Sequence, residues 1–226
     1  NAREASWPCR DEKVQMILQL PESPDDLGKQ LGSKRRSQIR RAQKENPTVQ
    51  RGGSELLNDF YEVFAITMRD LGTPVYSKRF FASILKYFPD NSELITIQLD
   101  GEPVSAALLL HHNGQLEIPW AGTLRKVNRL SINMLLYWEV LEHAIDRKFE
   151  RFDFGRSTLD SSTFKFKKQW GSEPLPMHWH YWTAPGTDVP KLNPDNPKYQ
   201  RAIAAWQKLP LWTSKLIGPH LVRNLP

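Results

Sequence analysis

The chain has 226 residues, 39% of them hydrophobic, and its 31 Lys and Arg against 25 Asp and Glu give a net charge of +6. No apolar run approaches the roughly 20 residues that a membrane-spanning helix needs, so the sequence does not predict a transmembrane protein. The single cysteine, Cys9, excludes an internal disulfide and a multi-cysteine metal site, which fits a reducing compartment. The positive charge favours anionic partners, which include nucleic acid, sugar phosphates and membrane surfaces.

The chain divides into three expected parts. It begins at Asn1 instead of Met and shows no signal-peptide pattern, which indicates an excised or processed piece of a longer protein. Residues 1–12 are then expected to be an N-terminal remnant or linker, residues 13–185 one folded domain, and residues 186–226 a Pro-rich helical tail.

The first half of the domain predicts more helix than strand. The expected elements are a strand at 13–20, a helix from Asp25 to about Gln43, a brief strand at 48–50, and helices at 54–71 and 76–88. The helix expected from Asp25 to about Gln43 carries a dense basic run, which consists of Lys34, Arg35, Arg36, Arg40, Arg41 and Lys44. Such a run is either a solvated face or a phosphate-binding surface, and we assign contact with phosphate or tRNA to Arg36, Arg40 and Arg41.

A second candidate anion site lies at the start of the helix expected at 76–88. Tyr76, Lys78 and Arg79 follow the turn at Pro74, where backbone N–H groups are also free. These three side chains could hold an anionic substrate.

The second half predicts an antiparallel meander followed by a long helix. Three strands at 93–99, 103–112 and 115–121 are joined by the hairpin turns Asp100-Gly101 and Asn113-Gly114. A helix at 129–148, strands at 149–154 and 175–183, and a helix at about 198–208 complete the expected elements. The tail combines Trp and Leu with Lys and Arg, a composition that suits either packing on the protein or contact with a membrane surface.

The segment from Phe149 to Gly171 carries the most informative pattern. Alternating aromatic and polar residues predict a strand that breaks at Gly155 and presents Asp153, Arg156 and Ser157 at its end. Aromatic and basic residues then alternate through Phe166 and Lys167, which suits a polyanionic or carbonyl-bearing ligand. The plainer interpretation is a half-buried strand followed by a solvated basic helix.

Several catalytic classes are not supported. His178 and His180 lie on one face of the last expected strand, but a third zinc ligand cannot be named, so we assign no metal. No G-x-S-x-G motif is present, and D-F-G at 153–155 lacks the glycine-rich loop and the H-R-D motif of protein kinases.

The order of elements resembles the acetyltransferase (GNAT) fold, an α+β architecture with a mixed, mainly antiparallel sheet flanked by helices. More specifically, A-G-T at 121–123, the long helix from Asn133, R-F-D-F-G-R-S at 151–157 and F-K-x-x-W-G at 166–171 resemble the second GNAT-like domain of the Fem family. The run R-D-L-G-T-P-V-Y-S-K-R-F-F at 69–81, with N-P-K-Y and L-P-L-W in the tail, is most similar to the Fem-like proteins of exopolysaccharide and PEP-CTERM export systems.

This resemblance implies a bacterial N-acyltransferase without a tightly bound cofactor, whose donor is aminoacyl-tRNA or acyl-CoA. Residues 13–185 would be its second GNAT-like domain, and the missing first domain would complete the substrate cleft. By resemblance to the Fem motif, Lys167 would contact the ester of the transferred acyl group, and Phe166 would form the adjoining wall of the site. We add Asp153 as a candidate base and Trp120 as a substrate contact. An ammonium near an ester carbonyl would stabilise the oxyanion formed when an amine attacks.

One departure bears on the donor. Acetyltransferases hold the coenzyme A pyrophosphate in R/Q-x-x-G-x-G/A, whereas residues 121–133 contain one glycine, with Arg125, Lys126 and Arg129 as partial substitutes. The expected acceptor is an amine of a nucleotide-linked or lipid-linked envelope precursor, at the inner face of the cytoplasmic membrane. Two alternatives stay open: an inactive scaffold that docks an export machine or membrane, and a plain nucleic-acid-binding protein.

Overall fold

The computed structural model describes residues 7–182, 184, 187 and 197–223. Its main feature is a seven-stranded sheet in the order β3-β4-β5-β6-β7-β2-β8. The strands are β2 (Lys13–Gln19), β3 (Thr48–Gly52), β4 (Ser92–Leu99), β5 (Glu102–His112), β6 (Gln115–Thr123), β7 (Arg151–Thr158) and β8 (Glu173–Pro176). Every neighbouring pair is antiparallel except β6 and β7, which are parallel. The expected mixed, mainly antiparallel α+β sheet is confirmed.

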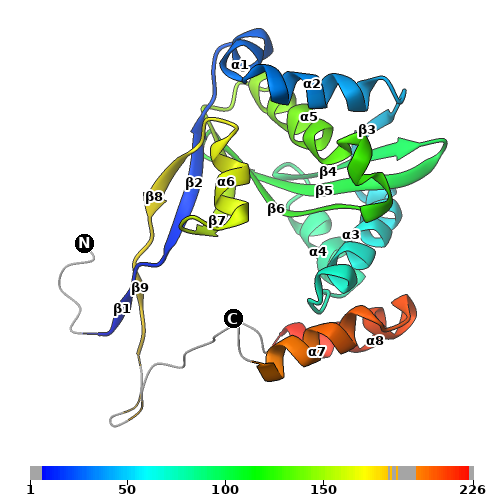
Figure 1. Cartoon of the computed structure of the whole chain (residues 1–226), viewed down its shortest axis with the longest axis vertical. Helices are drawn as coiled ribbons and strands as arrows, with labels where there is room; N and C mark the ends of the chain where they lie inside the picture. The colour runs from blue at the N-terminus through cyan, green and yellow to red at the C-terminus, as the bar shows by residue number, and fades with distance from the viewer. Residues whose placement is uncertain (1–6, 183, 185–186, 188–196, 224–226) are drawn as a thin grey trace.

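Helices cover both faces of the sheet (Figure 1). One face packs against α1 (Pro24–Gln30), α2 (Ser33–Gln43) and α5 (Ile132–Asp146), and the other against α3 (Leu57–Leu71) and α4 (Lys78–Tyr87). Because strand side chains alternate in direction, Leu94 of β4 joins the α3 core while Ile95 joins the α5 core. The remaining helices are α6 (Ser162–Lys168), α7 (Pro197–Gln207) and α8 (Leu211–Val222), with 3₁₀ turns at Ser54–Leu56 and Arg125–Leu130.

The helix expected from Asp25 to Gln43 is two helices, so that prediction is wrong. Leu31 is buried with an extended backbone, and Gly32 is extended as the N-cap of α2. The Arg36 guanidinium folds back and donates to the carbonyls of Gly28 and Leu31 at the end of α1. Burial of Leu31 and this capping therefore outweigh the helical charge pattern across the break.

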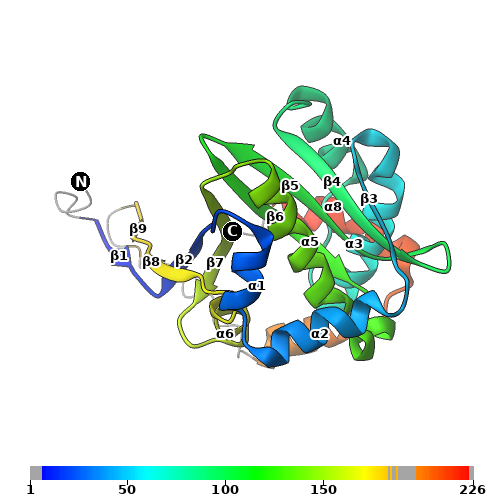
Figure 2. The same cartoon turned by 90° about the horizontal axis from the view of Figure 1, so that it is seen from above.

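The single strand expected at 175–183 is also wrong. β8 pairs with β2 and ends at Pro176, while β9 (Trp179–His180) pairs with β1 (Cys9–Arg10). Pro174 and Pro176 have no N–H to donate, which suits β8 to the edge of the sheet. Figures 1 and 2 show the β1–β9 ribbon extending away from the main sheet.

Truncation of a buried α5 side chain tests whether this helix supports the core. Leu136 is fully buried against the sheet, so Leu136→Ala should lower the free energy of unfolding by about 2–5 kcal/mol, measured by urea denaturation. Leu159→Ala is the matched control, because this leucine is exposed and should change the value by no more than about 0.5 kcal/mol. Equal effects of the two substitutions would contradict this packing.

Candidate functional site

The sheet opens between β6 and β7. These strands pair only from Gln115 to Glu117 on β6 and from Arg151 to Asp153 on β7. Beyond that point β6 stays paired with β5, and β7 stays paired with β2. The carboxyl ends of two parallel strands therefore separate, which is where ligands bind in many sheets that contain parallel strands.

The cause of this opening is a pair of irregularities at the same level. On β6, Glu117 pairs with Leu110 of β5 and Trp120 pairs with Leu108, so that the two residues Ile118 and Pro119 lie opposite the single residue Leu109. On β7, Phe154 and Gly155 occupy the corresponding position opposite Met16, and Gly155 has φ of +76°. Pro119 cannot donate a backbone hydrogen bond, and a bulge bends its strand, so the ladder cannot continue.

The strand expected to break at Gly155 continues instead to Thr158, so the predicted boundary is wrong. Glycine relieves the strain of a positive φ within the strand, because an added side chain would be disfavoured there. The Oδ1 of Asp153 accepts the N–H of Gly155 at 2.7 Å and fixes the bulge. Gly155 thus redirects β7 without ending it.

A cleft of about 480 Å³ occupies the opening. Its polar lining comes from β2, β6, β7 and α6, and Met177 and Trp179 close it from the segment after β8. The lining includes Gln15, Glu117, Ile118, Pro119, Asp153, Phe154, Gly155, Arg156, Lys167, Met177 and Trp179.

Lys167 extends from α6 to the bulge of β7. Its Nζ donates to the carbonyl of Gly155 at 3.1 Å and to that of Arg156 at 2.9 Å. Burial lowers the pKa of the Lys167 ammonium to about 8, although the carboxylate of Asp153 acts in the opposite direction. The amine is thus held beside the strand opening and is not directed into bulk solvent.

Two carboxyl groups lie side by side in the cleft. Glu117 and Asp153 are register partners on the paired ends of β6 and β7. Burial, followed by the charge of Asp153, raises the pKa of Glu117. Asp153 itself is 2% exposed and accepts hydrogen bonds from Gln15, from Gln115 at 3.4 Å and from the bulge N–H. Asp153 therefore has a structural task at the bulge, whereas Glu117 is better situated to accept a proton.

The other residues expected near Gly155 lie in different surroundings. The guanidinium of Arg156 lies 5.3 Å from the ring centroid of Trp179, both in the cleft lining. Ser157 is buried next to β2. Phe166 does not line the cleft, and its ring packs 5.0 Å from that of Tyr137 in the core.

Of the three residues expected to form a second anion site, only Tyr76 lies in an aromatic cluster, with Phe80 and Trp120. The ring of Tyr76 stacks on Phe80 at 4.9 Å and meets Trp120 edge-on at 6.2 Å. Lys78 and Arg79 are exposed at the first turn of α4, where Lys78 contacts Asn58. Neither Tyr76 nor Trp120 lines the cleft that contains Lys167.

Of the basic residues assigned to phosphate, Arg40 and Arg41 are exposed on α2. Arg36 is half-buried, and its guanidinium is engaged by the backbone carbonyls at the end of α1. Arg41 also reaches the carbonyl of Arg129 at 3.4 Å, which brings α2 next to the segment before α5.

Several hydrogen-bond donors of that segment are used within the protein. Residues 125–130 are a 3₁₀ turn in which the N–H groups of Val127 and Ser131 bond to the carbonyls of Leu124 and Asn128. Arg125 donates to the carbonyl of Asp70 at 2.5 Å, and Lys126 pairs with Glu102. Two backbone N–H groups and two of the three basic side chains of this segment are therefore engaged within the protein.

In the described ranges, no group of three or more His, Cys, Asp or Glu side chains could hold a metal ion. Across the same residues, none of the helices has the length and apolar character required to cross a bilayer.

A sequence-family model matches more than half of the chain. Residues 33–168 match the sequence model of the family described as acetyltransferase (GNAT) domain. The chain belongs to this GNAT family. GNAT acetyltransferases use acyl-CoA as a substrate and need no tightly bound cofactor. A search of curated proteins finds no match.

Three solved structures share the fold at low sequence identity. FemX has a TM-score of 0.64 and 17% identity, over 72% of this chain and 59% of FemX. A C-terminal domain assigned to a lysylphosphatidylglycerol synthetase of Agrobacterium fabrum has a TM-score of 0.58 and 12% identity, over 78% of this chain and 62% of that domain. L-PGS from Bacillus licheniformis has a TM-score of 0.54 and 14% identity, over 76% of this chain and 61% of L-PGS. The chain thus spans about three fifths of the length of each neighbour.

Sequence reasoning missed Glu117, Gln15 and Gln115 as site residues. They occupy polar positions in the strand patterns K-V-Q-M-I and Q-L-E-I-P, which predict only an uncovered face. The one available signal was Pro119, because a proline inside a strand pattern indicates an edge or a bulge.

The lowered pKa of Lys167 can be measured by pH-dependent labelling with an amine-reactive reagent and peptide mass spectrometry. Only the unprotonated amine reacts, so labelling of Lys167 should rise with an inflection near pH 8 instead of near 10.5, the value of an unperturbed lysine. Lys165, exposed on the same helix, provides the reference curve in the same digest. Coincident curves for the two lysines would contradict the burial of Lys167.

Proposed function

We propose that this chain is the acyl-transfer domain of a Fem-like enzyme that moves an aminoacyl or acyl group onto an amine of a cell-envelope or exopolysaccharide precursor. One observation carries the proposal: the Lys167 amine is held over the opening between β6 and β7, next to Glu117 and Asp153. The fold shared with FemX and with lysylphosphatidylglycerol synthetase supports aminoacyl transfer in general.

Lys167 would act on the carbonyl of the donor ester. With a pKa of about 8 it is mostly protonated at pH 7, so it can donate to the oxyanion that forms when the acceptor amine attacks. The carbonyls of Gly155 and Arg156 hold the ammonium in position before the reaction. A donor fixed in advance costs little reorganisation as the charge develops.

Glu117 would take the proton that the attacking nitrogen must lose. Burial beside Asp153 raises its pKa, which makes its carboxylate a stronger base than an exposed one. The C–N bond forms first and gives the oxyanion. As this intermediate collapses, the C–O bond of the ester breaks, and the proton held by Glu117 passes to the departing oxygen. Asp153 would help to position the Lys167 amine, because it stabilises the bulge whose carbonyls accept from that amine.

An aminoacyl-tRNA ester is the donor that we favour over acyl-CoA. The segment before α5 uses Arg125 and Lys126 for contacts within the protein, whereas α2 displays Arg40 and Arg41 beside it. Spaced cations on an exposed helix match the spaced phosphates of RNA. We propose that the acceptor is nucleotide-linked or lipid-linked, that a further domain of the same protein completes the cleft, and that the enzyme works at the inner face of the cytoplasmic membrane.

Removal of the Lys167 amine tests the catalytic proposal. In the full-length protein, Lys167→Ala should lower kcat/KM by about 10²–10³-fold, because one oxyanion donor is lost. The assay would follow transfer of radiolabelled amino acids from bulk aminoacyl-tRNA, with acetyl-CoA as a parallel donor, to a nucleotide-linked peptidoglycan precursor that bears a free amine.

Lys165→Ala on the exposed side of α6 is the matched control and should leave the rate unchanged. Unchanged product formation by Lys167→Ala, with the same circular dichroism spectrum as the wild type, would favour the inactive scaffold instead.

The contribution of α2 can be measured separately as affinity for bulk tRNA. Arg40→Gln with Arg41→Gln should weaken binding and reduce the slope of log affinity against log salt by about 2, since two phosphate contacts are lost. Lys86→Gln with Lys148→Gln removes the same charge from exposed sites outside α2 and should leave the slope unchanged. An equal loss in both double variants would mean that net charge alone attracts RNA.

A further inference from the structure

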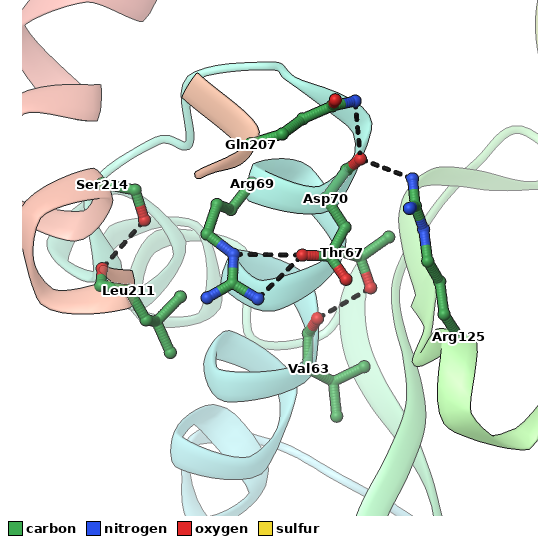
Figure 3. Close-up of polar contacts among 8 residues, drawn as sticks. All are labelled: Val63, Thr67, Arg69, Asp70, Arg125, Gln207, Leu211 and Ser214. Carbon is green, nitrogen blue, oxygen red and sulfur yellow. Dashed lines mark hydrogen bonds and ion pairs between the residues drawn. The ribbon is translucent and has the colours of Figure 1, made fainter. Parts of the chain in front are cut away.

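The C-terminal helices are fixed against α3. The Gln207 side chain at the end of α7 donates to the carbonyl of Asp70 at 3.0 Å, and Arg125 donates to the same oxygen (Figure 3). On α8, Gly218 lies so close to Val75 that an added Cβ would come within 3.0 Å of its backbone N and O atoms. Ser214 and Val222 are buried on the same side. The orientation of α8 about its own axis is therefore determined by packing.

This packing directs a row of large apolar side chains outward. Trp212 is 68% exposed and Leu216 is 62% exposed, and Ile217 and Leu221 continue the exposed surface. At 100° per residue, Trp212 and Leu216 lie on the arc opposite Ser214, Gly218 and Val222, Ile217 lies to one side of that arc, and Leu221 lies next to Ser214. We call Trp212, Leu216 and Ile217 the α8 apolar face. Rotation of the helix cannot bury this face, because the opposite arc already packs against α3 and Val75.

The charged residues of the C-terminal segment have one sign. Residues 197–226 contain five Lys and Arg and no Asp or Glu: Lys198, Arg201, Lys208, Lys215 and Arg223. Lys215 is engaged by Glu62 of α3, while Arg201, Lys208 and Arg223 are exposed. The exposed cations of the C-terminal helices thus favour an anionic surface as a partner.

We infer that the α8 apolar face docks this protein onto an anionic lipid bilayer. A 12-residue helix is about 18 Å long and too short to cross a membrane, so it would lie in the plane of the interface. Trp is favoured at that depth because its ring is amphipathic, and each basic residue near an anionic surface adds about fivefold to the affinity. Charge complementarity favours this occupant over a second copy, whose α8 would carry the same positive charge. The inference does not depend on the transferase activity.

Sedimentation with vesicles tests the inference on the full 226-residue chain. The wild type should sediment with vesicles of phosphatidylcholine mixed with phosphatidylglycerol, and added salt should release it. Trp212→Ser with Leu216→Ser should weaken this binding by at least about tenfold, because two side chains no longer enter the interface. Lys208→Gln with Arg223→Gln should also weaken it by about tenfold or more and reduce its dependence on salt.

Tyr87→Ser with Phe88→Ser is the matched control, since these residues are 70% and 56% exposed at the end of α4. This variant should bind vesicles like the wild type, and circular dichroism should show that every variant is folded. Absence of wild-type binding, or equal binding by the Trp212/Leu216 variant, would overturn the inference. A dimer in light scattering that the Trp212/Leu216 variant abolishes, without vesicle binding, would assign the face to a second copy instead.

Discussion

The separation of two parallel strands is the constraint on which the rest of the structure depends. β6 and β7 stay together as far as Glu117 and Asp153, and then each strand accommodates one extra residue. Pro119 removes a donor on one side, and Gly155 adopts a positive φ on the other. The backbone groups beyond this point lose their partner strand, and buried polar groups require other partners. The Lys167 ammonium supplies donors to two of these carbonyls.

The same arrangement determines the electrostatics of the cleft. An ammonium that is partly removed from water is less stable in its charged form, and this lowers the pKa of Lys167. A carboxyl group buried beside another carboxylate resists ionisation, and this raises the pKa of Glu117. The two shifts bring an acid and a base closer to neutral pH from opposite directions. Such perturbed pairs gather at functional sites more often than elsewhere in a protein.

The helices that support the sheet are distributed unequally around this cleft. α3 and α4 pack on the half of the sheet that contains β4, β5 and part of β6, whereas β7, β2 and β8 present Gln15, Arg151 and Glu173 on the same side. The polar residues of these strands could not face a packed helix without hydrogen-bond partners. A polar, uncovered half-sheet next to a well-packed half is therefore built into the strand patterns. α7 and α8 pack on the outer side of α3, and none of their described residues lines the cleft.

The sequence by itself determined the meander, the long helix and the lysine at the strand opening, because turns, periodicity and the F-K-x-x-W-G motif are local signals. It could not determine that residues 25–43 form two helices, since the break depends on Leu31 being buried and on Arg36 capping the end of α1. Only the tertiary structure brought Glu117 next to Asp153, which lie 36 residues apart on strands joined by α5. It also separated Tyr76 and Trp120 from the cleft, because aromatic packing draws these rings into the α3 core. Patterns along a chain fix which face of an element is apolar, whereas the meeting of two polar faces depends on strand order and register, which are properties of the assembled sheet.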